Sequence, residues 1–571
     1  MTANQLQTET KMRPRYLCGG NVQWSLIVLA LMVTGMPGLR AQEASPQRHV
    51  GAVQDWSAGT IIFSRDGLAK HPEVLTREPR VLNQVRQRWQ TPKADVFRGL
   101  DGGTNGQGIT GKRNPPQRDW NVTGLGGRLS TNMYPSKFSF DPGAAPDCVN
   151  DYVVFGLNNV GSAPNGNLVA FNNLYVDPAG DGFCTGIAPS VLFDYNISTL
   201  ATGRINTSPI LSLDGTKVAF VESVPGATPS STFHVLTWTA GQGTLAASVT
   251  PTAGQMSSLT ISATSDNTTS SPWIDYGNDV VYVGTNDGVI YKITGVFNGT
   301  PALAGSPWPV TVSSSLQLTP PVLDSTLGVL MVGSTNGTLY QINTTTGAVG
   351  TFVVGSGATS GIVAPPIVDV TNGTTFTVSA DDGVSGVLVE LETTTMGLLS
   401  KARIGEGSST GTALHLYQPA VSNDYFTSPS LGVVRVCGTG AADTTPWQYA
   451  FGFTGTTMKT AASFSKQLVN SATATCTGWT EFFNPNVGLP TGTDYFFFGL
   501  SEDCTGAGGA TDGCVAEITN AIPGTLVIST INGGTSGIVI DNYSTAAQAA
   551  SLYFAADKVN TAYKFTQNGL N

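Results

Sequence analysis

Six of the seven cysteines lie after the N-terminal apolar segment, and their even number predicts disulfide bonds. They are Cys148, Cys184, Cys437, Cys476, Cys504 and Cys514. An even number of cysteines in an exported chain favours disulfides, although six of them allow many connectivities. Pairing neighbours in the sequence gives 148–184, 437–476 and 504–514, and the connectivity stays open at this point. No Cys-x-x-Cys pair occurs and the four histidines are scattered, so we predict no metal site.

Three short motifs resemble catalytic or ligand-binding sequences, but each lacks part of what its chemistry needs. Gly407 to Gly411 fits G-x-S-x-G with Ser409 as the nucleophile, yet no strand-to-helix turn is predicted around it. Gly106 to Lys112 resembles a phosphate-binding loop, but Arg113 stands where a Ser or Thr is required. Asp381-Asp382-Gly383 follows a predicted strand, where we expect a turn and not a calcium site. We therefore predict no catalytic residue and no cofactor, and we assign no cofactor-binding residue.

A sequence repeat must form the fold that positions any functional side chains, and this repeat is clearest between Ser271 and Gly347. Five pairs of residues are each 49 apart: Pro272 and Pro321, Asp275 and Asp324, Gly284 and Gly333, Gly288 and Gly337, and Tyr291 and Tyr340. The apolar run from Val280 to Val283 predicts an inner strand packed on both faces. Asn-Asp-Gly then favours a hairpin, because Gly accepts a positive φ. One such sheet cannot bury both faces alone, so this period predicts the blades of a β-propeller.

The opening of the repeat recurs eight times, which predicts an all-β, eight-bladed β-propeller. Its copies begin at Tyr134, Ser208, Ser271, Pro320, Pro365, Gln418, Trp479 and Ser536. The sixth and seventh copies match least well, so seven blades remain an alternative. Asp119 to Thr123 has the position of a strand that precedes a blade opening, yet no blade comes before it. We predict that this N-terminal strand pairs with Tyr563 to Thr566 and closes the ring, which removes exposed edges.

The first 118 residues do not carry the repeat, and they divide into a leader and a basic extension. Lys11, Arg13 and Arg15 precede an apolar run from Trp24 to Met36, which predicts a signal peptide over residues 1–41. Residues 42–118 form the extension, which we expect to be partly ordered against the propeller or to act as a tether. Residues 72–90 have the pattern of a short amphipathic helix. The propeller takes residues 119–571, and we expect a protein exported to the periplasm or the extracellular space.

Charge is divided unevenly between the extension and the propeller. Residues 44–118 hold 12 basic and 6 acidic residues, whereas residues 119–571 hold 12 basic and 30 acidic residues. An acidic propeller argues against nucleic-acid binding, because phosphate contacts need a basic face. We expect a monomer with no membrane span once the leader is removed, and its partner is an unknown protein or glycan.

The segments Val281 to Tyr291 and Gly337 to Gly347 resemble the quinoprotein-like (pyrroloquinoline quinone-type) β-propeller repeat. The resemblance implies an exported, eight-bladed fold that serves both quinone-dependent dehydrogenases and non-catalytic scaffolds. Many of those dehydrogenases have two adjacent cysteines and a calcium site beside the quinone, and neither maps onto this chain. We therefore favour a non-catalytic propeller that binds a protein or ligand. The alternatives are a quinone-dependent oxidoreductase and a carbohydrate-binding propeller in which exposed rings such as Trp238, Trp447 and Trp479 stack on sugars.

Overall fold

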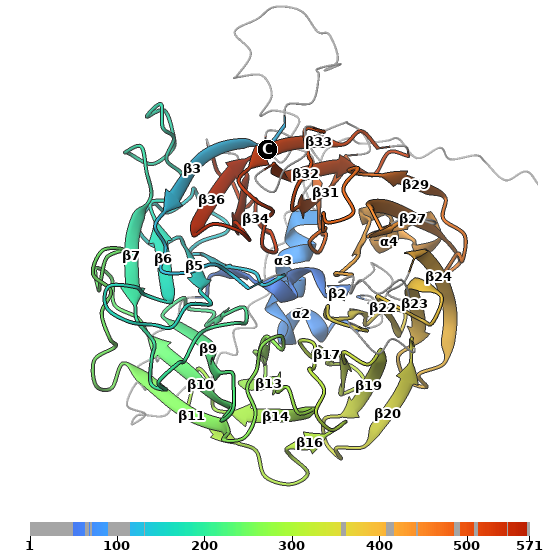
Figure 1. Cartoon of the computed structure of the whole chain (residues 1–571), viewed down its shortest axis with the longest axis horizontal. Coiled ribbons are helices and arrows are strands. Elements are labelled where there is room, and N and C mark those ends of the chain that lie inside the picture. Colours follow the sequence, from blue (N-terminus) through green and yellow to red (C-terminus); the bar gives the residue numbers. More distant parts are fainter. Residues whose placement is uncertain are drawn as a thin grey trace, which may run out of the picture. The chain divides into compact units, whose positions relative to one another are not determined.

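The computed structural model describes residues 50–62, 68, 71–88, 115–130, 132–355, 361–406, 416–440, 444–484, 492–506, 512–522, 524–544, 546 and 548–567. Eight antiparallel sheets surround a central channel, as the view along the channel shows (Figure 1). The predicted all-β propeller is confirmed, and the number of sheets decides for eight blades over seven. The predicted leader, residues 1–41, lies outside the described residues.

Each blade is a sheet whose first strand lies beside the channel and whose last strand lies at the rim. Blade 1 comprises β4 (Ser136–Ser139), β5 (Tyr152–Gly156), β6 (Leu168–Asn172) and β7 (Ser190–Tyr195), and blade 2 comprises β8 (Ile210–Leu211), β9 (Lys217–Val224), β10 (Ser230–Thr237) and β11 (Met256–Ser262). Blade 3 comprises β12 (Trp273–Asp275), β13 (Val280–Gly284), β14 (Val289–Thr294), β15 (Ala302–Leu303) and β16 (Val310–Thr311). Blade 4 comprises β17 (Val322–Asp324), β18 (Val329–Gly333), β19 (Thr338–Asn343) and β20 (Val349–Val353). Blade 5 comprises β21 (Ile367–Asp369), β22 (Thr374–Ser379), β23 (Ser385–Glu392) and β24 (Leu398–Glu406), and blade 6 comprises β25 (Ala420–Val421), β26 (Val433–Thr439), β27 (Pro446–Thr454), β28 (Thr457–Met458) and β29 (Phe464–Gln467). Blade 7 comprises β30 (Thr480–Asn484), β31 (Thr493–Leu500), β32 (Gly513–Thr519) and β33 (Val527–Ile531). Blade 8 comprises β34 (Val539–Asp541), β35 (Ser551–Ala555), β36 (Thr561–Thr566) and β3 (Gln117–Thr123).

The repeated aspartate closes the turn that follows the first strand of a blade. The Oδ1 atom of Asp324 accepts hydrogen bonds from the backbone N–H groups of Thr326 at 2.9 Å and Leu327 at 3.0 Å. Asp275 and Asp369 accept the corresponding bonds in blades 3 and 5. An Asp side chain that bonds the backbone two residues later favours a turn at that place. The aspartate of the repeat is therefore a folding signal.

The repeated glycine shapes the hairpin between the second and third strands. Gly337 has a φ of +82°, and a Cβ atom there would lie 2.4 Å from the carbonyl oxygen of Gly355. Gly288 in blade 3 has a φ of +77°. Only glycine adopts this conformation without strain and also leaves room for the neighbouring backbone. The Asn-Gly and Asp-Gly pairs of the sequence thus mark these hairpins correctly.

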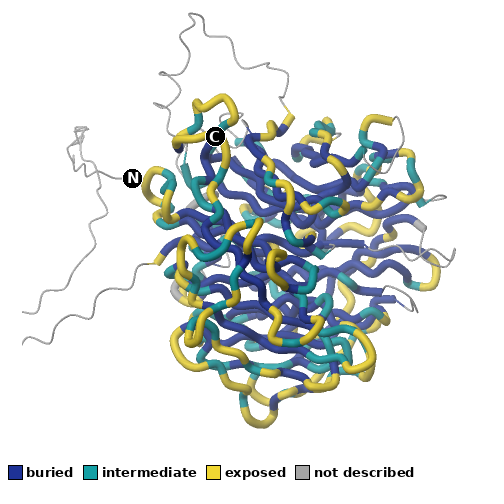
Figure 2. The backbone as a smooth tube through the Cα atoms, turned by 60° about the vertical axis from the view of Figure 1, so that its left-hand side comes forward, coloured by how far each residue is buried: buried dark blue, intermediate teal, exposed yellow. Residues whose placement is uncertain are grey.

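The core lies between blades, where apolar residues of adjacent sheets face each other. Between blades 2 and 3, for example, Val281 and Val283 of β13 pack with Val221 and Phe233 of β9 and β10. Figure 2 shows that buried residues follow the strands while exposed residues gather in the loops. Burial on both faces explains why the second strands of the blades are continuous apolar runs.

The ring is closed by β3, which supplies the outer strand of blade 8. Trp120 lies opposite Lys564 of β36, and its indole N–H donates a 2.9 Å hydrogen bond to the Leu174 carbonyl of blade 1. The Lys564 ammonium contacts the carboxylate of Asp119 inside the blade. Burial raises the pKa of Asp119 and lowers that of Lys564, so desolvation outweighs their mutual attraction. The predicted pairing of an N-terminal strand with the last blade is confirmed.

Three disulfides join neighbouring cysteines, as the sequence order suggests. The pairs are Cys148–Cys184, Cys437–Cys476 and Cys504–Cys514. The first links two loops at one end of the blade-1 strands. The other two lie in blades 6 and 7, at the end of the propeller opposite to the first disulfide. Among the described residues, no helix is long and apolar enough to cross a membrane.

Candidate functional site

The central channel is filled by the chain's own N-terminal segment. This channel segment, residues 50–88 as far as they are described, contains β1 (Ala52–Gln54), a 3-10 helix η1 (Trp56–Gly59), β2 (Ile61–Ile62), α2 (Val74–Arg77) and α3 (Pro79–Arg88). β1 adds to blade 1 by pairing antiparallel with β4, and β2 adds to blade 5 by pairing parallel with β21. Figure 1 shows α2 and α3 in the middle of the ring. The residues expected to form one helix over 72–90 form two.

The channel segment begins at one end of the channel, which we call the near face. This face carries the loops between the first and second strands and between the third and fourth strands of each blade. The backbone N–H of Gly51 donates a 2.7 Å hydrogen bond to the carbonyl of Leu213, which lies in such a loop of blade 2. Arg77 also lies at this face, because a Cβ atom added at Gly277, in a loop of blade 3, would lie 3.3 Å from its carbonyl oxygen. We call the opposite end the far face.

Arg80 of α3 anchors the channel segment in the ring. Its guanidinium bonds the carboxylate of Glu78 through Nη2 at 2.6 Å, the hydroxyl of Ser57 at 2.7 Å and the carbonyl of Ile274 at 2.7 Å. It also lies over the ring of Trp273, 4.2 Å from the centroid. Burial alone would lower the pKa of Arg80, but the Glu78 carboxylate raises it above its usual value. The group therefore stays charged, and it donates four hydrogen bonds that compensate for its burial.

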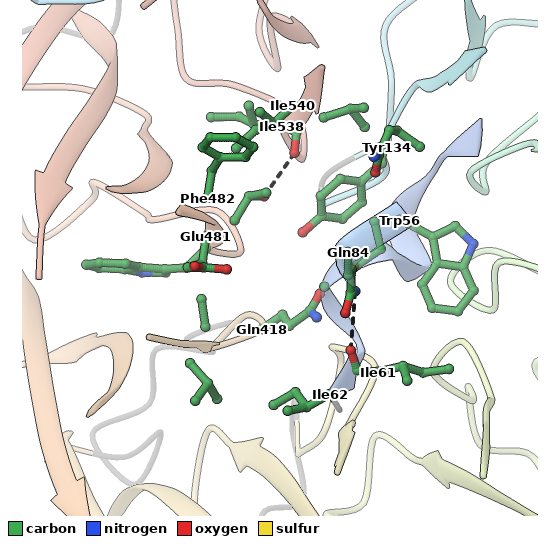
Figure 3. A pocket seen from close by; sticks show the side chains of 18 of the residues that line it. Trp56, Ile61, Ile62, Gln84, Tyr134, Gln418, Glu481, Phe482, Ile538 and Ile540 are labelled. Carbon is green, nitrogen blue, oxygen red and sulfur yellow. Dashed lines mark hydrogen bonds between the residues drawn. The ribbon is translucent and has the colours of Figure 1, made fainter. Parts of the chain in front are cut away.

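A cavity of about 80 Å³ remains between the channel segment and blades 6, 7 and 8 (Figure 3). Its outer wall comes from β25, β30 and β34, and its inner wall from β1, η1, β2 and α3. The hydroxyl of Tyr134, the carboxylate of Glu481 and the amide of Gln418 point into it (Figure 3). The rest of the wall is mainly apolar and includes the buried side chains of Phe482 and Ile538.

Several buried polar atoms around this cavity have no hydrogen-bond partner among the described residues. They are Asp55 Oδ2, Gln84 Oε1 and the indole nitrogens of Trp56 and Trp479. Burial also raises the pKa of Tyr134 above its usual value. Buried polar atoms in folded proteins nearly always find a partner, so water or a small polar molecule is expected here. A space of this size holds several waters but is well below the roughly 300 Å³ of ordinary small-molecule sites.

The cavity that the described residues leave in the channel does not fit the quinone that the repeat implies. A fused three-ring quinone needs a space of the drug-sized class, on the order of 300 Å³ or more. The cavity has about 80 Å³, and α2 and α3 lie in the middle of the channel instead (Figure 1). Among the described residues, no group of three or more His, Cys, Asp or Glu side chains is placed to hold a metal ion.

A second cluster brings together Ser258, His234 and Glu222 on three neighbouring strands of blade 2. His234 Nδ1 lies 2.9 Å from the Ser258 hydroxyl, and His234 Nε2 lies 3.0 Å from Glu222 Oε2. A Ser–His–acid chain can activate the serine for acyl transfer when an oxyanion site and a substrate cavity adjoin it. Ser258 lines neither the channel cavity nor the smaller cavity around Tyr175. Glu222 also accepts a hydrogen bond from the Leu200 N–H at 3.1 Å, so the cluster ties blade 2 to the loop from blade 1.

Other residues singled out in the sequence have structural roles or lie outside the described residues. Asp382 Oδ1 accepts the N–H groups of Val384 and Ser385, and Asp381 accepts that of Gly383, as in an ordinary turn. The G-x-S-x-G motif with Ser409 and the phosphate-loop motif at residues 106–112 lie outside the described residues.

The tryptophans considered for sugar binding are not free platforms. Trp479 is only 2% exposed and stacks on Phe498, with ring centroids 4.1 Å apart, so the expectation of an exposed ring is wrong for it. Trp238 and Trp447 are half-buried, and their indole N–H groups bond the Gly215 carbonyl and the Thr445 hydroxyl. A large ring at the start of an inner strand packs against its neighbours because both faces of a blade are covered.

Comparisons with known proteins show similarity to other propellers. No family model and no curated protein matches the chain. BamB from Moraxella catarrhalis is 15% identical over 79% of this chain and 99% of that chain, with a TM-score of 0.44. The Dos1 propeller is 10% identical over 79% and 95%, with a TM-score of 0.45, and the dihydro-heme d1 dehydrogenase NirN in complex with DHE is 11% identical over 76% and 77%, with a TM-score of 0.40. Likenesses this distant add nothing to the fold that the sheets already establish.

Proposed function

We propose that this protein is an exported scaffold that binds a partner protein through its loops and catalyses no reaction. The observation that supports this proposal is the channel segment, which fills the axis with the chain's own residues. Propellers often bind small ligands in cavities at the centre of the fold. With the axis occupied, the surfaces left for a partner are the near face, the far face and the rim.

The disulfides support the same proposal, because they stiffen loops on both faces. Cys148–Cys184 links two loops of the near face, and Cys504–Cys514 closes a loop of the far face. A loop held in one conformation loses less entropy when it binds a partner. Disulfides of this kind persist in oxidising compartments, which supports export to the periplasm or the extracellular space.

The proposal is tested first by asking whether the protein has quinone chemistry. Purified protein is incubated with calcium and pyrroloquinoline quinone, and thermal melting and dye reduction with alcohols and sugars are measured. We expect an unchanged melting temperature and no dye reduction. Quinone-dependent turnover would overturn the proposal, because it would require a cofactor site for which the channel segment leaves little room.

Binding is tested by placing a photo-crosslinking residue at single exposed positions on each face and on the rim. The protein is exported by its own cells, irradiated, and analysed for adducts. We expect discrete adducts from a group of positions on one surface. Adducts from no position, or equally from every position, would reject a specific partner.

A further inference from the structure

Among the described residues, exposed large apolar side chains lie mostly in loops of the near face and along the outer strands β15, β20 and β24. Val149, Phe183 and Ile187 in blade 1 are 68%, 42% and 66% exposed. Leu327 in blade 4 and Leu431 in blade 6 are exposed on the same face, but each stands alone in its blade's loops. Single exposed apolar residues are ordinary on protein surfaces, whereas a group of them marks an interaction site. Blade 1 is therefore the place to examine.

The three apolar residues of blade 1 belong to two loops that are fastened together. We call Val149, Phe183 and Ile187 the blade-1 patch. Val149 follows Cys148 and Phe183 precedes Cys184, and the disulfide holds the two Cα atoms of these cysteines 5.8 Å apart.

Hydrogen bonds add to this fastening. Asn173 donates its backbone N–H to the Cys148 carbonyl at 2.9 Å and its side-chain amide to the Thr185 carbonyl at 3.0 Å. The side-chain amide of Asn172 donates to the Val149 carbonyl at 2.9 Å. Since both loops are held at several points, the patch cannot bury itself by a local rearrangement, and it is preorganised for a partner.

The sequence segment that carries the blade-1 patch contains acidic but no basic residues, and the buried Lys137 just before it is paired with Asp151 and Asp541. Residues 138–203 contain six Asp and no Lys, Arg or His. Asp141 and Asp181, in the same two loops, are exposed. An apolar patch among carboxylates complements a surface with apolar and basic side chains, and it repels nucleic acid and anionic membranes.

We propose that the blade-1 patch is the docking surface for a partner protein that presents an apolar side chain flanked by Lys or Arg. This inference rests on the scaffold function proposed above and names the surface and the chemistry of the partner. The apolar side chain packs against Val149, Phe183 and Ile187, while the flanking cations meet Asp141 and Asp181. The apolar contact supplies most of the affinity, and the charges supply the association rate and the choice of partner.

The test uses a fluorescent, amphipathic peptide of Leu, Phe and Lys as the probe, titrated into the full-length protein and followed by anisotropy. A peptide with Glu in place of every Lys is its control. We expect the Lys peptide to bind and the Glu peptide not to bind. The double variant Val149→Ser/Ile187→Ser should weaken binding at least about tenfold, which corresponds to 1.4 kcal/mol. Asp141→Lys/Asp181→Lys should weaken it further at low salt.

Leu327→Ser is the matched control, because Leu327 is an exposed apolar residue of the same face outside the patch. It should leave the affinity unchanged, and equal melting temperatures should show that all variants fold. The inference is overturned if the Lys peptide does not bind, if both peptides bind alike, or if Leu327→Ser weakens binding as much as the patch variant. Discrete photo-crosslinks from other surfaces would then leave the scaffold function standing, whereas quinone-dependent turnover would remove that function itself.

Discussion

Replacing Arg80 by Met should release the channel segment while leaving the ring folded. Arg80 is 4% exposed and bonds two groups of its own segment, Glu78 and Ser57, and one carbonyl of the ring, Ile274. Methionine fills similar space but provides no donor. The Glu78 carboxylate, itself 5% exposed, would then be buried without a counter-ion.

The cost can be bounded from this arrangement. Removing one partner of a buried ion pair typically costs about 3–5 kcal/mol, because the remaining charge is uncompensated. Replacing both partners by neutral groups is often close to neutral. We therefore expect Arg80→Met to destabilise the seated segment strongly and Glu78→Gln/Arg80→Met to recover much of the loss.

The assay is hydrogen exchange followed by mass spectrometry, with peptides that cover residues 52–62 and 74–85. A loss of 3–5 kcal/mol corresponds to an acceleration of roughly 10² to 5 × 10³-fold in these peptides. Peptides from β35 serve as an internal reference, and Arg77→Met is the matched control because Arg77 is exposed in the same segment.

Three results would contradict the reasoning about Arg80. Unchanged exchange in residues 52–62 would mean that the segment does not depend on this anchor. A double variant as fast as the single one would mean that the lost hydrogen bonds, and not the unpaired Glu78 charge, account for the effect. Acceleration in β35 as well would show that the ring and the segment unfold together.

Three further predictions concern the ring. Burial raises the pKa of Asp194 to about 7, and its Oδ1 atom has no partner among the described residues. Because the folded protein holds the Asp194 proton more tightly than the unfolded chain does, the free energy of unfolding should fall by up to about 4 kcal/mol from pH 4 to pH 8. Asp194→Asn should remove this pH dependence in urea melts at several pH values. Parallel slopes in both proteins would contradict it. Asp119→Ala leaves the buried Lys564 ammonium unpaired and should cost about 3–5 kcal/mol in denaturant melts, and a cost below about 1 kcal/mol would mean that β3 does not close the ring as described. Non-reducing peptide mapping should recover Cys504 and Cys514 in one short linked peptide, and free thiols there would argue against an oxidising compartment.

The ring could be predicted from the sequence because its signals are local and repeated. Asp324 closes a turn with residues two and three positions away, and Gly337 meets the demand of one hairpin. Each blade repeats such signals, so eight weak observations support one another. The closing strand was predictable for the same reason, since Trp120 precedes a blade opening and has no blade of its own.

The filled channel was not predictable in this way, because its contacts occur once and join distant residues. Trp56 meets Trp273 edge-on, with centroids 5.4 Å apart, across more than two hundred residues. Neither β1 nor β2 is longer than three residues, which is too short for a periodic signal. An amphipathic pattern over residues 72–90 was visible, but nothing in it distinguishes a helix in a channel from a helix on a surface. The half-burial of Trp238 and Trp447 was hidden for a similar reason, since it depends on neighbouring blades.

The charge imbalance between extension and propeller suggests that long-range attraction seats the channel segment, but the contacts argue otherwise. The carboxylate that pairs with Arg80 belongs to Glu78, two residues away in the same segment. The blades contribute the Ile274 carbonyl and the indole of Trp273 to the contacts of Arg80. Salt screens exposed charges far more than buried pairs, so these contacts should barely respond to it. Exchange of residues 52–62 should therefore be nearly equal in 0.05 M and about 1 M sodium chloride, where the screening length falls to about 3 Å. Strong acceleration at high salt would show that the acidic ring holds the basic segment by its overall field.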